Sequence, residues 1–406
     1  MEPLGVLIDA NNLKAGVGTT KYRRGIFFVC YNLINELVKR NDIRLYFYIN
    51  KENSSVLKKY IKKEWPFYKC IFFEYRPLIF YNLYQKYENS KFLFFILSKI
   101  INYQKNNQRD YCKKFLLDNN CKVYLSTYHK IPGIFSNYDI RKFTIVYDLI
   151  PFLVKGSFSA SDVEKLQRLV NSFNQNDYYF TISECTKRDL ISTVGNINSN
   201  HVYNSYISCR DDISHEVLTD SVKRKYNIPL NKKYIFSLFA FEKRKNLENT
   251  IKAFLSFVSK NKLKDIVYVV GGSPADYKPD FSDINDFSNI IFTGYIDDSD
   301  LNAIYSGAEF FVFTSMYEGF GLPVLEAMRC GCPVVTSNSS SLPEVIGDAG
   351  IMIDWDSLEQ HVAAFERYYF DSDFKNESIK KGFMQSKKFS WKKTVDLMIE
   401  KMRINI

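Results

Sequence analysis

Short apolar runs alternate with longer amphipathic stretches through the second half of the sequence, and this alternation constrains the fold most strongly. We expect strands at Tyr234–Phe239, Ile266–Val270, Ile290–Thr293, Phe310–Phe313 and Pro333–Thr336. One of the intervening helices carries Leu247, Ile251 and Phe254 at helical spacing on a single face. Strict strand–helix alternation predicts a doubly wound α/β domain, in which ligands bind at the carboxyl ends of the strands.

The first half of the chain begins with an apolar run at Leu4–Asp9, a polar loop and an amphipathic helix. Lys21 stands where a dinucleotide-binding fingerprint has its third glycine, so the signal for NAD is weak. Backbone amides at a helix start nevertheless suit an anion. Gly16, Gly18 and Thr19 are therefore candidates for a loop that binds a diphosphate or the acceptor. Further strands are expected at Leu45–Tyr48, Val123–Ser126, Phe143–Val146 and Tyr179–Ile182.

A chain of 406 residues exceeds what one hydrophobic core usually serves, so two domains are expected. The hydrophobic fraction of 46% and the charged fraction of 25% exclude a disordered chain. We predict two Rossmann-like domains. Their expected bounds are residues 1–204 and 233–385, joined by a polar linker at 205–232 and followed by a C-terminal helix at 386–406.

Most of the net charge of +10 lies between Lys51 and Lys114, where 14 basic and five acidic residues give a net charge of +9. Aromatic residues are interleaved with these lysines and arginines. A basic, aromatic surface suits anionic lipid headgroups, which predicts peripheral contact with a membrane. The alternative is that the aromatics belong to the core and the lysines to a solvated face. Nucleic acid is the least favoured partner, because no known binding motif accompanies the charge.

The sequence also predicts a cytoplasmic location. The start, Met1–Gly5, has no basic region of the kind that opens a signal peptide. The longest strongly apolar run, Phe92–Leu97, is far shorter than a membrane-spanning helix requires. The eight cysteines lack the spacing of a disulfide framework, so reduced thiols are expected.

Two adjacent cations, Arg244 and Lys245, stand at a strand-to-helix turn. Asn246 follows them and is a good candidate for the N-cap of the helix, which would place free amides and the positive end of the helix dipole beside both cations. This combination suits a diphosphate. The alternative is a solvated loop followed by a capped helix.

A second candidate feature is the loop Ser315–Pro323, which contains two glycines and a proline that can open a helix. Glu318 lies in this loop, and Glu326 lies in the first turns of the following helix. The two oxygens of an ionised carboxylate can accept hydrogen bonds from the vicinal hydroxyls of a sugar or a ribose. Taken singly, Glu326 could be a helix-dipole acid and Glu318 a surface residue, but the loop, the acid pair and the cationic turn together favour a site.

These residues resemble a known family. Glu318–Met328 together with Gly331–Val335 looks like the donor-site signature of the retaining glycosyltransferases of family 4, the glycosyl transferases group 1, which have the GT-B fold. Similar family motifs occur at Arg244–Leu247, Phe292–Tyr295, Ser341–Val345, Phe389–Trp391, Tyr147–Pro151 and Thr181–Glu184.

The resemblance implies that the two Rossmann-like domains face each other across a cleft that contains the active site, and that the C-terminal helix at 386–406 packs back on the first domain. It also implies roles for individual residues. Arg244 and Lys245 would bind the donor diphosphate, and Glu326 the ribose hydroxyls. The transferred sugar would contact Glu318, Gly319, Phe320, Gly321 and Leu322, and the nucleotide base would lie near Gly294 and Tyr295. Catalytic roles are expected for Glu318, Lys245, Tyr147 and Asp148. Tyr147 stands where many relatives have a histidine that contacts the donor sugar, and Phe239 where they often have Gly or Arg.

The family needs no divalent metal, because a helix end and cations neutralise the leaving phosphate. The four histidines of this chain show no metal-ligand spacing, so neither a metal nor another cofactor is expected. The D-x-D pattern at Asp298–Asp300 fits a helix start, and the one at Asp354–Asp356 fits a turn after a strand.

The expected function is retaining transfer of a hexose from a nucleotide sugar, GDP-mannose or a UDP-sugar, to a lipid-linked or polysaccharide acceptor. Synthesis of a surface glycan of the O-antigen or capsule type would use such an enzyme at the inner face of the cytoplasmic membrane. Two alternatives remain open. The acceptor could be a soluble sugar phosphate, or the protein could be a nucleotide-sugar-binding scaffold without turnover.

Overall fold

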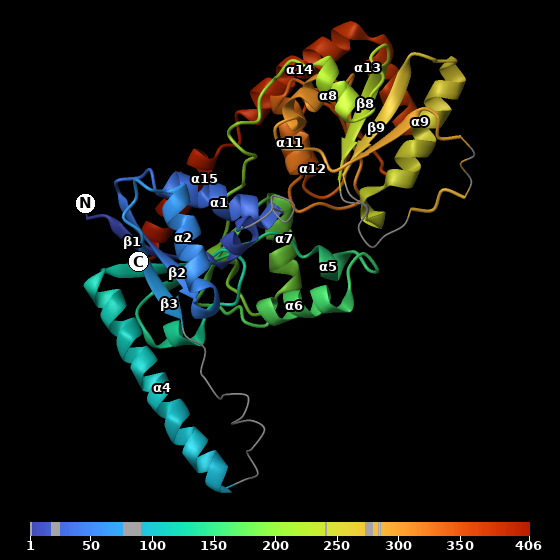
Figure 1. Cartoon of the computed structure of the whole chain (residues 1–406). Coiled ribbons are helices and arrows are strands. Elements are labelled where there is room, and N and C mark those ends of the chain that lie inside the picture. Colours follow the sequence, from blue (N-terminus) through green and yellow to red (C-terminus); the bar gives the residue numbers. More distant parts are fainter. Residues whose placement is uncertain are drawn as a thin grey trace.

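The computed structural model describes residues 2–17, 25–75, 91–239, 242–272, 279–282, 284 and 286–406. The chain forms two α/β domains, each built around its own parallel sheet (Figure 1). Residues 18–24, which include the predicted loop residues Gly18 and Thr19, lie outside the described part of the chain.

The N-terminal domain has a seven-stranded sheet in the order β3-β2-β1-β4-β5-β6-β7. Its strands are β1 Leu4–Asp9, β2 Ile43–Asn50, β3 Ile71–Tyr75, β4 Cys121–Ser126, β5 Arg141–Val146, β6 Tyr178–Thr181 and β7 Val202–Asn204. Its α-helices are α1 Gly25–Leu37, α2 Ser54–Glu64, α4 Lys91–Asp118, α5 Ile150–Leu153, α6 Ala160–Val170 and α7 Glu184–Thr193. The central strands are buried on both faces, as the near-continuous apolar sequence of β1 requires of a covered parallel strand.

The C-terminal domain has a six-stranded sheet in the order β10-β9-β8-β11-β12-β13. Its strands are β8 Lys233–Leu238, β9 Ile266–Gly271, β10 Ile290–Gly294, β11 Phe311–Phe313, β12 Val334–Ser337 and β13 Ile351–Ile353. The helices from the linker onward are α8 Asp220–Lys225, α9 Leu247–Asn261, α10 Leu301–Ser306, α11 Leu322–Arg329, α12 Leu342–Ile346, α13 Leu358–Phe370 and α14 Ser372–Ser386.

Both sheets reverse their strand order beside the first strand of the domain, as in a doubly wound nucleotide-binding fold. The predicted architecture of two Rossmann-like domains is therefore confirmed. The strands expected from the sequence are present with ends shifted by at most two residues, and β1 has the predicted bounds. The short edge strands β3 and β7 were not anticipated, and the expected linker contains the short helix α8.

The last helix, α15 Trp391–Ile404, packs against α1 of the N-terminal domain (Figure 1). Asp396 forms an ion pair with Arg40, and Arg403 Nη2 donates to the backbone oxygen of Asp42 over 2.6 Å. At the start of α15, the indole of Trp391 donates to the carbonyl of Cys209 at 2.9 Å. The chain therefore leaves the second domain and returns to the first.

Helix α4 extends away from the body of the N-terminal domain (Figure 1). Most of this helix lies in the basic segment between Lys51 and Lys114, whose aromatic residues divide into two groups. Trp65 and Phe73 are buried in the core, whereas Phe95 and Tyr103 are exposed by 56% and 69%. Residues 76–90 of the segment lie outside the described part. Among the described helices, none combines the length and the hydrophobicity that crossing a bilayer requires.

Candidate active site

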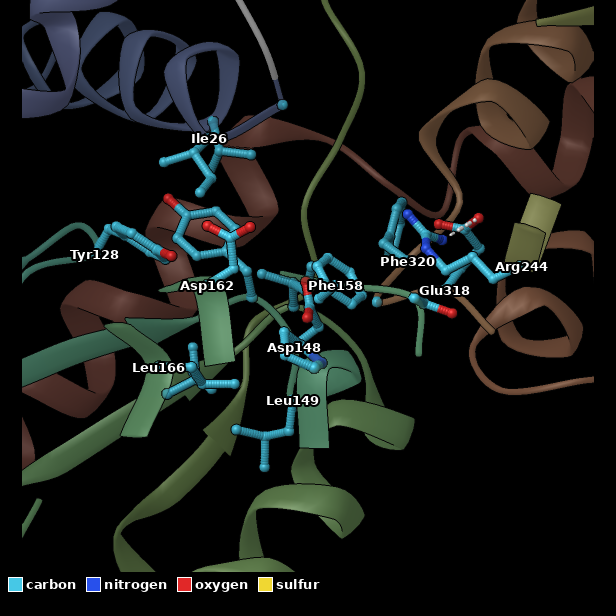
Figure 2. Close-up of a pocket in the computed structure, with 18 of the residues that line it drawn as sticks. Ile26, Tyr128, Asp148, Leu149, Phe158, Asp162, Leu166, Arg244, Glu318 and Phe320 are labelled. Atoms are coloured by element: carbon cyan, nitrogen blue, oxygen red, sulfur yellow. Dashed lines mark hydrogen bonds and ion pairs between the residues drawn. The ribbon is translucent and has the colours of Figure 1, made fainter. Parts of the chain in front are cut away.

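A cavity of about 1120 Å³ lies between the two domains and is lined by both (Figure 2). Its walls come from the segments that follow β5 and β6 in the first domain and β8 and β11 in the second. These are the carboxyl ends of the strands, where open parallel sheets bind ligands. The sequence-predicted residues that line the cavity are Tyr147, Asp148, Arg244, Lys245, Glu318, Gly319, Phe320, Gly321, Leu322 and Glu326.

Arg244, Lys245 and Glu318 form a buried triad on the C-terminal wall. Lys245 Nζ donates to Oε1 of Glu318 at 2.6 Å, and Arg244 Nη1 donates to the same oxygen at 2.9 Å. Arg244 also donates to the carbonyl of Tyr317 at 2.9 Å and lies 2.8 Å from Glu242 in an ion pair. These contacts join the turn that follows β8 to the loop that follows β11, at the point where both segments line the cavity.

The charges of this triad set the protonation of Glu318. Burial by itself raises the pKa of its carboxyl group, but the charges of Arg244 and Lys245 outweigh burial and lower the pKa to about 2. Glu318 is therefore ionised at neutral pH. Burial lowers the pKa of Lys245, and the positive charge of Arg244 acts in the same direction.

Asn246 does not cap helix α9 with its side chain, contrary to the sequence expectation. Its backbone is left-handed, with φ of 62°, and no helix amide donates to its side chain. The side-chain amide instead bonds to the carbonyl of Trp355, and Oδ1 accepts a hydrogen bond from the side chain of Asn249 at 2.8 Å. The side chain therefore bonds to a side chain in the first turn of α9 and not to its backbone amides, and it joins α9 to the segment after β13.

The loop that carries Glu318 makes direct contact with the N-terminal domain. A Cβ atom on Gly319 would lie 2.7 Å from the carbonyl oxygen of Tyr147 and 3.0 Å from Cβ of Asp148. Only glycine allows the two domains to approach this closely. Ser183, at the start of α7, donates to the carbonyl of Gly319 at 2.7 Å. The following Gly321 has φ of 102°, a left-handed value that glycine adopts without strain, and leads into α11.

Tyr147 and Asp148 form the opposite wall. The Tyr147 side chain is buried, and its hydroxyl has no hydrogen-bond partner within the described residues. Burial raises the pKa of Asp148, while the amide of Ile150, which donates to Oδ1 at 3.0 Å, lowers it. Both residues line the cavity from the N-terminal domain.

Glu326 lies on α11 at the edge of the cavity. Tyr305 donates a hydrogen bond to its Oε2 at 3.1 Å. Burial raises the pKa of this carboxyl group, and the charge of Arg210 and the Tyr305 hydroxyl only partly offset that effect. The polar end of Glu326 is thus held in place by a neighbouring helix, α10.

Three other predicted residues are not among the described residues that line the cavity. Gly294 ends β10 with φ of 69°, and Tyr295 after it is 40% exposed. Gly16 is a packing glycine, because a Cβ atom there would lie 2.3 Å from the ring of Phe27. Sequence reasoning in turn missed Tyr128, Phe158 and Asp162, which line the N-terminal side (Figure 2). No motif surrounds these three residues that could have identified them.

Comparison with known proteins finds relatives of the C-terminal domain and of the whole fold. Residues 219–385 match the family described as glycosyl transferases group 1. These residues form a glycosyl transferases group 1 domain. It contains Arg244, Lys245, Glu318 and Glu326, which the resemblance in the sequence had assigned to the donor.

Several relatives of this chain are named as mannosyltransferases. The chain is 33% identical over 268 residues to the serotype-specific mannosyltransferase WbdA of Escherichia coli. This alignment covers 63% of this chain and 32% of WbdA. It is 46% identical over 102 residues to the O-antigen chain mannosyltransferase B of Escherichia coli, covering 25% of this chain and 27% of that protein. The chain thus matches about a third of the length of these relatives.

The fold of the whole chain is also similar to that of solved structures. Sucrose-phosphate synthase from Thermosynechococcus elongatus aligns with a TM-score of 0.67 at 15% identity, over 99% of this chain and 98% of that one. The alignment includes both domains, so the arrangement of the glycosyl transferases group 1 domain with its N-terminal partner is the GT-B fold.

Proposed function

We propose that this protein is a retaining glycosyltransferase that moves a hexose, with mannose from GDP-mannose the first candidate, to a lipid-linked or polysaccharide acceptor of an O-antigen-type glycan. The observation that carries the proposal is the buried Arg244–Lys245–Glu318 triad in a cavity between two domains. The mannosyltransferase names of the relatives support the transferred sugar.

The two cations suit the donor diphosphate. Lys245 and Arg244 carry more N–H groups than Glu318 can accept, so they can hold phosphate oxygens while they keep the carboxylate in place. The ionised Glu318 accepts hydrogen bonds from hydroxyls of the transferred sugar, and Glu326 accepts them from the ribose. Neutralisation of the leaving phosphate by these side chains makes transfer without a divalent metal possible.

In the proposed reaction, the bond between the anomeric carbon and the diphosphate oxygen breaks, and a bond from that carbon to the acceptor oxygen forms on the same face. The proton of the acceptor hydroxyl passes to the departing phosphate oxygen. Asp148 and Tyr147 line the cavity from the N-terminal domain, where the acceptor would enter.

The acceptor class is supported by helix α4. Ile96, Ile100 and Tyr103 are exposed at helical spacing on one face, and the Lys99 ammonium lies 4.3 Å from the ring centre of Phe95 beside that face. An exposed apolar strip flanked by cations suits the interface of an anionic membrane, where a lipid-linked acceptor resides. We therefore propose that the protein lies peripherally on the cytoplasmic face of a membrane.

The test is a nucleotide screen of the full chain with EDTA present. We expect one nucleoside diphosphate and its sugar, GDP and GDP-mannose first, to raise the melting temperature selectively. Incubation with that donor and an acceptor extract should then form product, and NMR of the new linkage should show the anomeric configuration of the donor. Binding without turnover would favour the scaffold alternative, and turnover with a soluble sugar phosphate would replace the lipid-linked acceptor.

A further inference from the structure

A short segment of the C-terminal domain, residues 340–344, binds the loop that carries Glu318. Ser340 Oγ accepts a hydrogen bond from the backbone amide of Glu318 at 2.9 Å. Ser341 Oγ lies within hydrogen-bond distance of two carbonyls, those of Glu318 at 2.9 Å and Phe320 at 3.0 Å. The start of α12 therefore fixes the backbone of the loop on both sides of Gly319.

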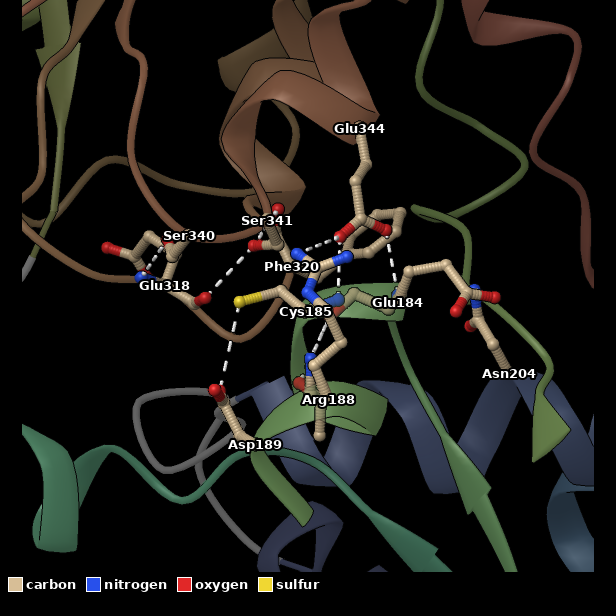
Figure 3. Close-up of polar contacts among 12 residues, drawn as sticks. Glu184, Cys185, Arg188, Asp189, Asn204, Glu318, Phe320, Ser340, Ser341 and Glu344 are labelled. Carbon is tan, nitrogen blue, oxygen red and sulfur yellow. Dashed lines mark hydrogen bonds and ion pairs between the residues drawn. The ribbon is translucent and has the colours of Figure 1, made fainter. Parts of the chain in front are cut away.

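The same segment ends in Glu344, whose carboxylate binds the N-terminal domain (Figure 3). Its Oε2 accepts the backbone amide of Glu184 at 2.8 Å, and its Oε1 accepts the amide of Cys185 at 2.7 Å. These two amides open helix α7, where the helix leaves its own N–H groups without acceptors. The amide of Thr186 is taken by Ser183 Oγ at 3.0 Å, so Glu344 completes the cap from the other domain.

Two further contacts lie beside this one. Tyr317, next to Glu318 in the chain, donates from its hydroxyl to Oδ2 of Asp189 on α7 at 2.6 Å. Arg188 lies 3.9 Å from the Glu344 carboxylate. Helix α7 thus contacts the active-site loop directly through Tyr317 and indirectly through Glu344.

We propose that Glu344 is a positioning residue that holds the Glu318 loop against Tyr147 and Asp148 by capping α7. This inference rests on the proposed function. A carboxylate at two free helix amides is stabilised by charge-assisted hydrogen bonds and by the helix dipole. When that carboxylate is lost, the two amides bond to water instead, and the contact between the domains becomes weaker. The donor residues Arg244, Lys245 and Glu326 all belong to the C-terminal domain, so nucleotide affinity does not depend on this contact.

The test compares Glu344→Gln with wild type. The glutamine side chain replaces one of the two acceptor oxygens by an NH2 donor, which cannot accept the hydrogen bond of the second α7 amide. We expect amide hydrogen exchange at residues 184 and 185 to become at least tenfold faster, and the transfer rate to fall about tenfold or more. Affinity for the nucleoside diphosphate should stay within twofold. Glu344→Asp should recover part of the transfer rate, because it keeps both acceptors.

The matched control is Glu359→Gln, which changes an exposed acid in the first turn of α13 of the same domain. It should leave both exchange and transfer unchanged. Unchanged exchange at residues 184 and 185 in Glu344→Gln would overturn the proposal, as would an equal loss of nucleotide affinity and transfer. Because hydrogen exchange needs no substrate, a wild-type protein without transferase activity would refute the proposed function while the domain contact is still tested.

Discussion

The ammonium group of Lys245 donates to Oε1 of Glu318 over 2.6 Å, so the two residues form one charge pair although 73 positions separate them. From the sequence, Lys245 is predicted to bind the donor diphosphate and Glu318 to bind the transferred sugar. Because the pair joins those two parts of the donor site, a change at either residue affects both.

Replacement of Lys245 by alanine should lower the turnover number roughly tenfold or more, since a cation that neutralises the leaving phosphate is lost. The measurement is the rate at saturating donor. Lys260→Ala is the control, because that lysine lies on the exposed face of α9 and pairs with Glu366. A Lys245→Ala enzyme with the wild-type rate would remove the phosphate role.

The low pKa of Glu318 predicts a specific acid sensitivity. Its folded pKa of about 2 lies below the ordinary value of 4.5, so ionised Glu318 stabilises the fold above pH 4.5, and this contribution disappears as the pH falls toward 2. Glu318→Gln should lack that part of the acid transition. At neutral pH it should cost about 3 kcal/mol, because Arg244 and Lys245 lose a buried partner. Chemical denaturation of both proteins between pH 2 and pH 7 measures the difference.

The pKa of Glu326 is shifted in the opposite direction to that of Glu318. Burial raises its folded pKa above the ordinary value, so the folded state binds the proton more tightly, and the cost of ionised Glu326 grows as the pH rises through that pKa. At neutral pH, Glu326→Gln should therefore raise the melting temperature by about 1–3 °C while it weakens nucleotide binding. Glu366→Gln is the control, because the pKa of this surface acid is lowered by its hydrogen bond with Lys260. A variant of Glu326 with wild-type affinity in calorimetry would contradict its ribose role.

The unpartnered hydroxyl of Tyr147 predicts a change that separates stability from activity. Removal of this hydroxyl in Tyr147→Phe breaks no hydrogen bond, so thermal stability should not fall. The transfer rate should drop about tenfold if the hydroxyl bonds the transferred sugar in the complex. In the control Tyr234→Phe, a bond of 2.6 Å to the carbonyl of Ile304 is lost, and about 1 kcal/mol of stability should be lost with it. Equal activity of Tyr147→Phe and wild type would assign the tyrosine to packing alone.

The exposed face of α4 should govern binding to membranes. The double change Ile100→Ser and Tyr103→Ser removes apolar area from that face, so it should weaken binding to vesicles that contain anionic lipid several-fold. Co-sedimentation measures binding, and activity on a soluble acceptor analogue should persist. Val217→Ser, at a residue that is 75% exposed outside α4, is the control. Equal vesicle binding by the variant and the wild type would show that the exposed face of α4 is a solvated surface without a role in membrane binding.

Much of the fold follows from local pattern. The run Leu4–Asp9 is β1 with the predicted bounds, because a strand buried on both faces must be continuously apolar. Ile71–Tyr75 forms β3. Its aromatic residues lie in a basic segment that could equally form a surface, so the sequence pattern did not predict whether this stretch belongs to the sheet.

The sequence by itself determined two doubly wound domains, the cationic turn at Arg244 and Lys245, and the acidic pair Glu318 and Glu326, because these features depend on short-range spacing. The tertiary structure alone decided which of them touch. The side chain of Asn246 bonds to Trp355 instead of capping α9, Gly319 makes a close contact between the domains, and Glu344 caps a helix some 160 positions earlier in the chain. Contacts of this kind depend on how two rigid domains meet, and local propensity carries no information about that orientation.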